Sequence, residues 1–286
     1  GGNMLVQNDP AILQKPAPID AAQSLPIQIL NPLQAAKYYK LRLYAPSPKL
    51  ASLVDKYWVM RWDLLDHPPF TCEVIPSAYT NLTFMPGGSR ITDVTTGKYQ
   101  YELTGSGIIF GVMFHPGGLY PFYGKSLSEL TDTTLPAEQI FAWANDALNS
   151  AMLREKSDDH GVAHIESLLL QQLPAADPNI QLIGRILERV EMMETPTVAS
   201  LCQSMDLSER RVQELLREYV GVGLKWIMLR SRLQRAAQFA ATSHTSNWAE
   251  IASELGYGDQ SHFINDFKRL IGKTPAQYEK DIHLPS

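Results

Sequence analysis

The sequence has 286 residues, of which 44% are hydrophobic and 19% are charged, and its formal net charge at pH 7 is −5. This composition excludes a disordered chain, and the length allows two domains with cores of their own. No apolar run reaches the roughly 18 residues of a membrane-spanning helix. No signal peptide is visible, and Cys72 and Cys202 have no ligand-spaced partners. We therefore expect a cytoplasmic protein with reduced thiols and no membrane partner.

The negative charge is confined to one part of the chain. Residues 178–286 carry 13 Lys and Arg against 13 Asp and Glu, so the acidic excess lies entirely in residues 1–177. A neutral domain can bind DNA when its basic residues share one face, although the affinity is then modest and sensitive to salt. The whole-chain charge therefore does not exclude a nucleic-acid partner.

The first half of the sequence predicts an arm and then a β-rich domain. Residues 1–40 contain several prolines and little periodicity, which favours an extended arm. Residues 41–175 begin with short β-branched and aromatic runs separated by Pro, Gly, Asn and Asp, which are typical of a small β-barrel or sandwich. The predicted strands are 56–64, 72–75, 81–86, 89–95, 99–103 and 108–114.

Two helices are predicted after these strands, at residues 136–153 and 162–173, because apolar residues recur on one face of each stretch. Pro174 and Pro178 then disfavour helix, which predicts a short connector. A connector of this length should keep the second domain, residues 179–286, close to the first.

The second domain is expected to be helical throughout. An amphipathic helix is predicted at residues 179–194, and residues 197–221 predict a short helix, a turn and a helix capped by Ser208, which is a helix-turn-helix. Residues 221–242 predict a long helix. At about 1.5 Å per residue it would span roughly 27 Å, close to one turn of DNA at about 34 Å.

A second helix-turn-helix is predicted at residues 248–278. Apolar residues recur at helical spacing up to Gly256, where a positive φ is easily adopted by glycine. Asp259 is placed to cap the next helix, and Gly272 to end it. The outer face of that helix is polar, as a recognition helix requires.

The detailed pattern resembles a known family. The run IASELGYGDQSHFINDFKRLIGKTPAQY, residues 251–278, resembles the C-terminal signature of the AraC/XylS family of transcription regulators, in which I-A-x-x-x-G-Y-x-D-Q-S-H-F precedes F-K and G-x-T-P-x-x-Y. The segment VMFHPGGLYPFYGKSLSELTD, residues 112–132, resembles a signature of the N-terminal domains of one subgroup. Family members often have Arg where this chain has Asn265, a basic residue where it has Glu214, and proline where it has Leu224.

The resemblance implies an α+β fold with two parts. The N-terminal part would be a cupin-like β-barrel with flanking helices, used for sensing and dimerisation. The C-terminal part would be all-helical, with two helix-turn-helix units joined by a long helix and bound to promoter DNA. Its partners would include RNA polymerase and a second copy of the chain.

The family's DNA contacts, carried over by position, fall on the two recognition helices and their surroundings. Arg forks onto guanine, and Gln or Asn onto adenine, whereas Lys and Arg also contact phosphates. The base-reading candidates are Arg210, Arg211, Gln213, Gln260, Ser261, His262 and Asn265, and the phosphate candidates are Arg217, Arg230, Lys268 and Lys273.

The first domain is predicted to hold an apolar pocket for a small-molecule effector. Aromatic strand residues would line it, and an arginine would anchor an anion; the candidates are Tyr57, Trp58, Arg61, Trp62, Tyr79, Phe84 and Arg90. A filled barrel without a ligand is an equal alternative, because small barrels are normally packed solid. No metal or other cofactor is predicted, because His115 has no clustered ligands and fits a turn histidine bonded to backbone.

These observations predict a sequence-specific DNA-binding transcription regulator rather than an enzyme. Two alternatives stay open: a regulator controlled by a partner protein through a ligand-free barrel, and a cupin-like enzyme with a DNA-binding appendage. The effector, the promoter, and the choice between activation and repression are not encoded in any recognisable pattern.

Overall fold

The computed structural model describes residues 16–19, 35–193, 196–242 and 247–283. Most of the predicted arm, residues 1–40, therefore lies outside the described residues. The strands are β1 (Ala17–Ile19), β2 (Lys40–Ala45), β3 (Val54–Leu64), β4 (Phe70–Val74), β5 (Thr80–Phe84), β6 (Arg90–Thr92), β7 (Tyr99–Leu103), β8 (Gly105–Phe114) and β9 (Thr134–Pro136).

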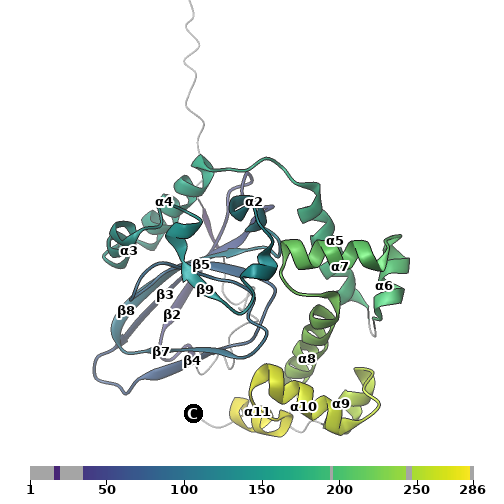
Figure 1. The fold of residues 1–286 in the computed structure, drawn as a ribbon. Helices are drawn as coiled ribbons and strands as arrows, with labels where there is room; N and C mark the ends of the chain where they lie inside the picture. Colours follow the sequence, from purple (N-terminus) through teal and green to yellow (C-terminus); the bar gives the residue numbers. More distant parts are fainter. Residues whose placement is uncertain (1–15, 20–34, 194–195, 243–246, 284–286) are drawn as a thin grey trace, which may run out of the picture.

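The helices confirm the α+β prediction. Those beside the sheets are α2 (Tyr120–Tyr123), α3 (Asp146–Leu153) and α4 (Asp158–Gln171), with short 3-10 turns η1 (Leu127–Glu129) and η2 (Ala137–Gln139). The C-terminal helices are α5 (Pro178–Met192), α6 (Val198–Met205), α7 (Glu209–Tyr219), α8 (Leu224–Thr242), α9 (Trp248–Glu254), α10 (Gln260–Ile271) and α11 (Pro275–Ile282). Figure 1 shows α8 running from the group α5–α7 to the group α9–α11.

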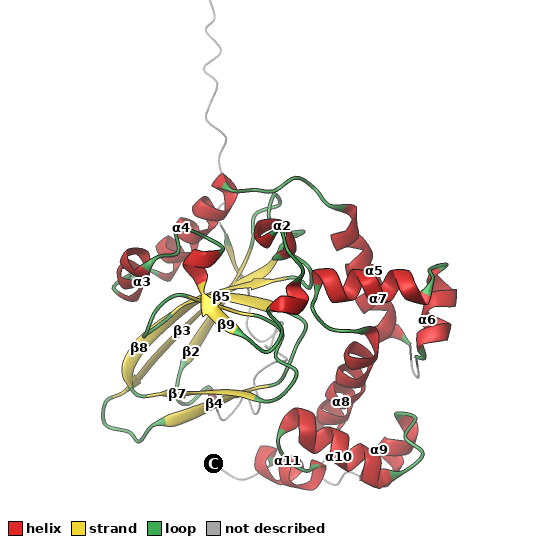
Figure 2. Ribbon diagram, viewed as in Figure 1, coloured by secondary structure: helices red, strands yellow, loops and turns green. Residues whose placement is uncertain are grey.

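The predicted barrel is not closed. Seven strands form one antiparallel sheet in the order β1-β2-β3-β8-β5-β6-β9, while β4 and β7 pair only with each other in the described part of the chain. Figure 2 shows β4 and β7 as a ribbon apart from the larger sheet. Because the strands divide into two sheets, the space between them is not bridged by a continuous ladder.

The two faces of the larger sheet have different coverings. Along β3, Tyr57 faces the helices, where its hydroxyl donates to Glu166 of α4. Its neighbour Trp58 faces the other way and lines the space toward β4 and β7. This alternation is the ordinary consequence of the strand pleat.

One predicted helix is wrong. Residues 136–153 form the short turn η2, a loop and then α3, which begins only at Asp146. The helix starts there because the Asn145 side chain accepts a hydrogen bond from the Leu148 backbone N–H at 3.0 Å. The apolar residues before it, including Phe141 and Ala144, are buried from the loop instead.

The hydrophobic cores do not divide the chain at the connector between α4 and α5. One cluster contains the helix-facing side of the sheet together with α5, α6 and α7, for example Tyr57, Ile183 and Leu216. A second cluster holds α9, α10 and α11 with the end of α8. Within the described ranges, no helix is both long and apolar enough to cross a membrane.

Candidate nucleic-acid interface and ligand cavity

The second helix-turn-helix, α9–α10, forms as its sequence dictates. Gly256 has a φ of +81° at the turn, a conformation that glycine adopts without a Cβ clash. Asp259 caps α10 by accepting a hydrogen bond from the Ser261 backbone N–H at 2.9 Å. Phe263 and Phe267 are fully buried against α9 and α11, and this fixes which face of α10 is exposed.

The exposed face of α10 carries its predicted base-reading residues together with the phosphate candidate Lys268. The side chains of Gln260, Ser261, His262, Asn265 and Lys268 are all exposed. His262 Nε2 lies 3.5 Å from Asp266 Oδ2, so its ring is drawn toward the helix. Asp266 is nearly buried and also accepts the Tyr257 hydroxyl at 3.1 Å. The amide side chains of this face are therefore presented to solvent on a rigid helix.

The first recognition helix, α7, presents a charged face. Ser208 caps it by accepting from the Arg211 backbone N–H at 3.1 Å, as predicted. Arg210 Nε pairs with Glu214 at 2.7 Å, and Arg211 donates to Asn179 Oδ1 of α5 at 2.7 Å. Exposed pairs one helical turn apart are weak, so Arg210 can exchange Glu214 for another acceptor. Gln213 and Arg217 are also exposed.

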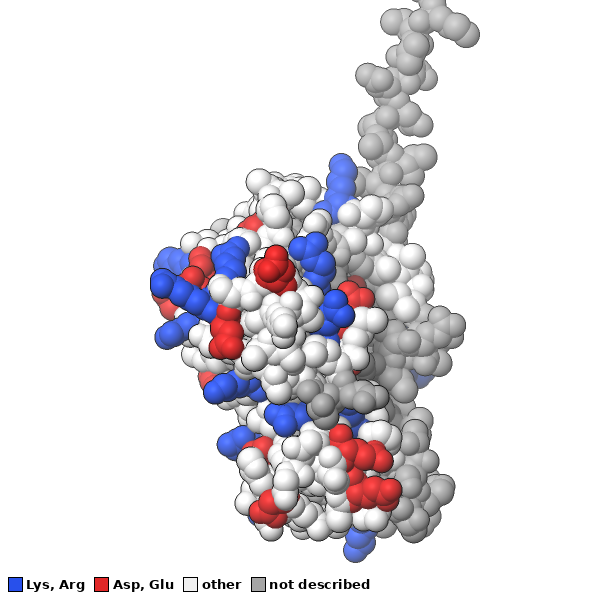
Figure 3. Space-filling model, turned by 90° about the vertical axis from the view of Figure 1, so that its right-hand side faces the viewer, with Lys and Arg blue, Asp and Glu red and all other residues white. Residues whose placement is uncertain are grey.

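The spacing of the two units suits adjacent major-groove segments. Helix α8 has 19 residues, which at about 1.5 Å each span roughly 28 Å. One turn of B-DNA is about 34 Å. On the face seen in Figure 3, basic and acidic side chains are interspersed rather than gathered into one basic patch.

Two phosphate candidates lie elsewhere. Arg230 is half-buried, its Nε donates to the Pro76 carbonyl O at 3.0 Å, and desolvation lowers its pKa. Lys273 pairs with Asp281 at 2.7 Å and with Glu73 of β4 at 3.3 Å. Both residues therefore connect the helical part to the sheet domain, and we do not include them in the DNA face.

A cavity of about 120 Å³ lies between the two sheets. Of the seven predicted pocket residues, Trp58 and Tyr79 line it. Burial raises the pKa of Tyr79 to about 12, so its hydroxyl stays protonated. The cavity wall also includes Asp93 and Tyr101, which the sequence did not single out because neither belongs to a recognisable motif.

The other five predicted pocket residues lie outside the cavity lining. Tyr57 bonds Glu166 on the helix side, and Phe84 is buried beside Trp143 on that side, with ring centroids 6.5 Å apart. Trp62 Nε1 donates to the Thr104 carbonyl O at 3.0 Å. Arg90 lies beside the turn at Gly87.

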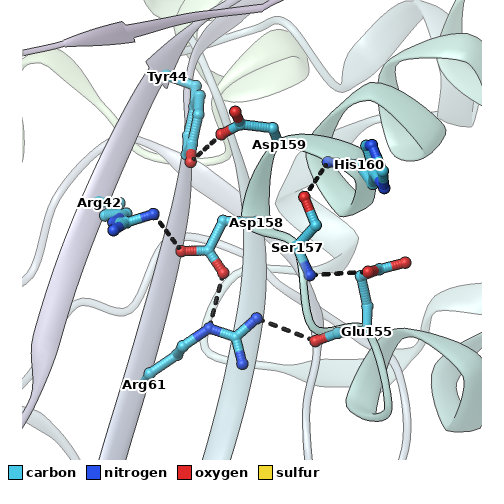
Figure 4. Close-up of polar contacts among 8 residues, drawn as sticks. All are labelled: Arg42, Tyr44, Arg61, Glu155, Ser157, Asp158, Asp159 and His160. Carbon is cyan, nitrogen blue, oxygen red and sulfur yellow. Dashed lines mark hydrogen bonds and ion pairs between the residues drawn. The ribbon is translucent and has the colours of Figure 1, made fainter.

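Arg61 is committed to the start of α4, as Figure 4 shows. Its Nε pairs with Asp158 at 2.7 Å and its Nη2 donates to the Glu155 carbonyl O at 2.9 Å. Asp158 is almost fully buried and also receives Arg42 at 3.4 Å. Because breaking a buried ion pair leaves an uncompensated charge, Arg61 holds α4 on the sheet and is not an anchor for an anionic ligand.

His115 has the surroundings of a structural turn residue. Its Nε2 lies 3.1 Å from the Ala51 carbonyl O, and its Nδ1 lies 3.8 Å from Asp55. Among the residues that the structure describes, no group of three or more His, Cys, Asp or Glu is placed to hold a metal ion.

The sheet domain docks directly on the first recognition helix. The Tyr120 ring, which follows the Pro-Gly-Gly turn, stacks on Tyr219 of α7 with centroids 3.9 Å apart. Tyr219 in turn donates to Asp177 at 2.6 Å and accepts from Asn179 at 3.0 Å. Since Asn179 also holds Arg211, the turn is connected to a predicted base-reading side chain through direct contacts.

Gly221 lies within this docking contact, where its carbonyl O accepts a hydrogen bond from Thr131 Oγ1 at 2.8 Å. Its φ is +87°, and a Cβ there would lie 2.5 Å from Thr131 Oγ1 and 2.9 Å from the Leu127 carbonyl O. We expect Gly221→Ala to lower the free energy of unfolding by about 1–3 kcal/mol, measured by urea denaturation. Gly97→Ala, where a Cβ would meet open space, is the control, and equal stability of the two variants would contradict the prediction.

Comparison with known proteins agrees with this geometry. Residues 201–281 match the family described as "Helix-turn-helix domain", and residues 42–136 match "Domain of unknown function (DUF6597)". The chain is 28% identical over 101 residues to "Probable transcriptional regulator LumQ" of Photobacterium leiognathi, covering 35% of this chain and 40% of that one. Together with the signature at residues 251–278, these matches decide what the C-terminal region is. Residues 201–281 form an AraC-type helix-turn-helix domain.

Two further matches each cover about a third of the chain. An "Uncharacterized HTH-type transcriptional regulator" of Haemophilus influenzae is 29% identical over 87 residues, which are 30% of this chain and 29% of that one. A solved regulator from Chromobacterium violaceum, with "AraC-type DNA-binding domain-containing proteins" in its description, is 20% identical with a TM-score of 0.33. That match covers 38% of this chain and 96% of that one. The chain thus spans less than half of the length of the curated relatives it matches.

Proposed function

We propose that this chain is a sequence-specific DNA-binding transcription regulator that acts at promoters in the cytoplasm. The observation that carries the proposal is the pair of helix-turn-helix units, each with an exposed polar face on its second helix, held apart by α8. One polypeptide would place α7 and α10 in successive major-groove segments of double-stranded DNA.

The exposed side chains suggest how bases are read. Gln260 and Asn265 of α10 would each bond an adenine edge, with Ser261 and His262 of the same helix beside them. From α7, the residues that would contact bases are Arg210, Arg211 and Gln213. Lys268 and Arg217 would contact phosphates and set the register. These roles follow from residue type and exposure.

A small-molecule effector in the first domain would act through the loop that follows β4. Tyr79 lines the cavity, while Pro76 accepts the bond from Arg230 of α8 and Ile75 belongs to the hydrophobic cluster of the second unit. An occupant that binds one position of this loop better than another would shift the second unit relative to the first. Such differential affinity is what control by a ligand requires.

The proposal also includes a homodimer and contact with RNA polymerase. The apolar stripe on α4, including Val162, Ile165 and Leu169, is buried within the chain, so a homodimer would have to use another face of α3 or α4. Contact with RNA polymerase is implied by the AraC/XylS resemblance. We propose no catalytic step.

The test is binding of the purified chain to fragments of its own promoter region across a salt series. We expect the double variant Gln260→Ala with Asn265→Ala to lose specific binding by about 30- to 25,000-fold, since each good bidentate contact contributes about 1–3 kcal/mol and two are removed. Weak binding that falls steeply with salt should survive, because the phosphate contacts are untouched.

The control is Gln100→Ala, which removes an exposed glutamine from β7 of the sheet domain. It should bind every fragment as the wild type does. If the double variant also binds like the wild type at all salt concentrations, α10 does not read bases and the proposed interface is wrong.

A further inference from the structure

The cavity between the two sheets has a mainly apolar and aromatic wall. Trp58 of β3 and Ile109 of β8 lie on the side of the larger sheet, and Tyr99 and Tyr101 of β7 lie on the opposite side. Its volume of about 120 Å³ approaches that of an apolar cavity of about 150 Å³ that binds benzene. The space therefore fits one compact molecule with a single ring.

One carboxylate in this wall lacks half of its hydrogen bonds. Asp93 has only 2% of its surface exposed, and its Oδ1 accepts the Thr80 hydroxyl at 2.7 Å. Its Oδ2 is buried without a hydrogen-bond partner among the described residues. Burial raises the pKa of Asp93 to about 6, and the Thr80 hydroxyl and the Val94 backbone N–H lower it in part. A buried carboxylate oxygen without a donor is costly.

The other charged group in the wall is Lys56. Its ammonium pairs with Asp55 at 3.1 Å, and both side chains are largely buried. Because Lys56 has an acidic partner outside the cavity lining, its charge is already balanced. Among the described residues, Asp93 is therefore the charged wall residue with no ion-pair partner, and its Oδ2 has no hydrogen-bond donor.

We propose that the cavity binds a compact, mainly apolar ring compound that carries an amine or hydroxyl group, which donates a hydrogen bond to Asp93 Oδ2. The inference rests on the proposed control of this regulator by a small molecule, and it names the class of that molecule. The ring packs between the aromatic walls, and an ammonium group gains a further attraction from their faces. The donor supplies the bond that the protein itself does not provide.

Calorimetric titration of the full chain with three probes of similar size tests the inference. Benzylamine and benzyl alcohol carry a donor, whereas benzyl methyl ether does not. We expect the first two to bind about ten- to hundredfold more tightly than the ether, because a hydrogen bond to a charged group contributes that much. Asp93→Asn should remove most of the preference for benzylamine and leave the affinity of the ether unchanged.

Two further variants locate the binding. Asp63→Asn, at an exposed carboxylate of β3, should bind all three probes like the wild type. Thr92→Phe, at a half-exposed wall residue of β6, should fill the space and abolish all binding. Ether binding as tight as amine binding, binding that survives Thr92→Phe, or no binding of any probe at millimolar concentration would each overturn the inference.

The same samples separate this inference from the proposed function. Promoter binding that is intact in a protein that binds none of the probes rejects the ligand class and leaves the DNA-binding role standing. Donor-selective probe binding in a chain that shows no sequence-specific DNA binding rejects the regulator and leaves the ligand site standing.

Discussion

Replacing Phe267 by alanine is expected to cost about 3–5 kcal/mol of the stability of the second helix-turn-helix. The ring is fully buried and lies at the centre of an aromatic group, with its centroid 5.8 Å from that of Phe263, 6.0 Å from Trp248 and 5.7 Å from Tyr278. Specific DNA binding should disappear, because α10 is positioned by this packing. Urea denaturation, monitored by tryptophan fluorescence, measures the loss of stability. A promoter-binding assay measures the loss of specific DNA binding.

The remainder of the molecule should stay folded in that variant. The second unit has a hydrophobic cluster of its own, while the first unit shares a cluster with the sheet. The control is Phe239→Ala on α8, whose phenylalanine is 45% exposed, and it should lose much less stability. A single cooperative loss of the whole chain in Phe267→Ala would show that the two clusters are not energetically separate.

The second large effect concerns pH and Asp93. Burial raises the pKa of this carboxyl from 3.8 to about 6, so the folded protein binds its proton more tightly than the unfolded chain. The contribution of Asp93 to the free energy of unfolding is therefore greatest below about pH 4 and falls as pH rises through about 6. Above that range the ionised carboxylate costs up to about 3 kcal/mol.

Asp93→Asn removes the charge and is expected to be more stable than the wild type at pH 7.5 by about 1–3 kcal/mol. The difference should vanish as pH falls toward 4, where Asp93 is protonated in the wild type. Denaturation curves at several pH values measure it, with Asp63→Asn as the matched exposed control. A variant less stable than the wild type at pH 7.5 would mean that the carboxylate has a charge partner.

The helical half could be predicted because its signals are local. The place of Ser208 and Asp259 before apolar periodic runs predicts that they cap helices, and both accept the expected backbone hydrogen bonds. The barrel could not be predicted in the same way, because closure depends on which strands pair over long distances. Nothing in the sequence of β4 or β7 shows that they pair only with each other among the described strands.

The same difference between local and long-range signals applies to the candidate site. Exposure of Gln260 and Asn265 follows from helical periodicity alone, whereas the place of Arg230 and Lys273 depends on how the helical part docks on β4 and the loop after it. The pocket prediction combined Tyr57 with Trp58, although adjacent strand residues point to opposite faces. Asp93 was missed because an isolated buried acid leaves no pattern in a single sequence.

The two helix-turn-helix units are held to the sheet domain to different extents, because only the first shares its hydrophobic core with the larger sheet. Helices α5 to α7 are built into the body of the sheet domain, but α9 to α11 are attached through the end of α8, Ile75 and the ion pair of Lys273 with Glu73. The first unit would therefore fix the registration of the protein on the operator. The second unit would be able to tilt relative to the first. The protein should therefore bind operators with slightly altered spacing without distortion of the whole molecule.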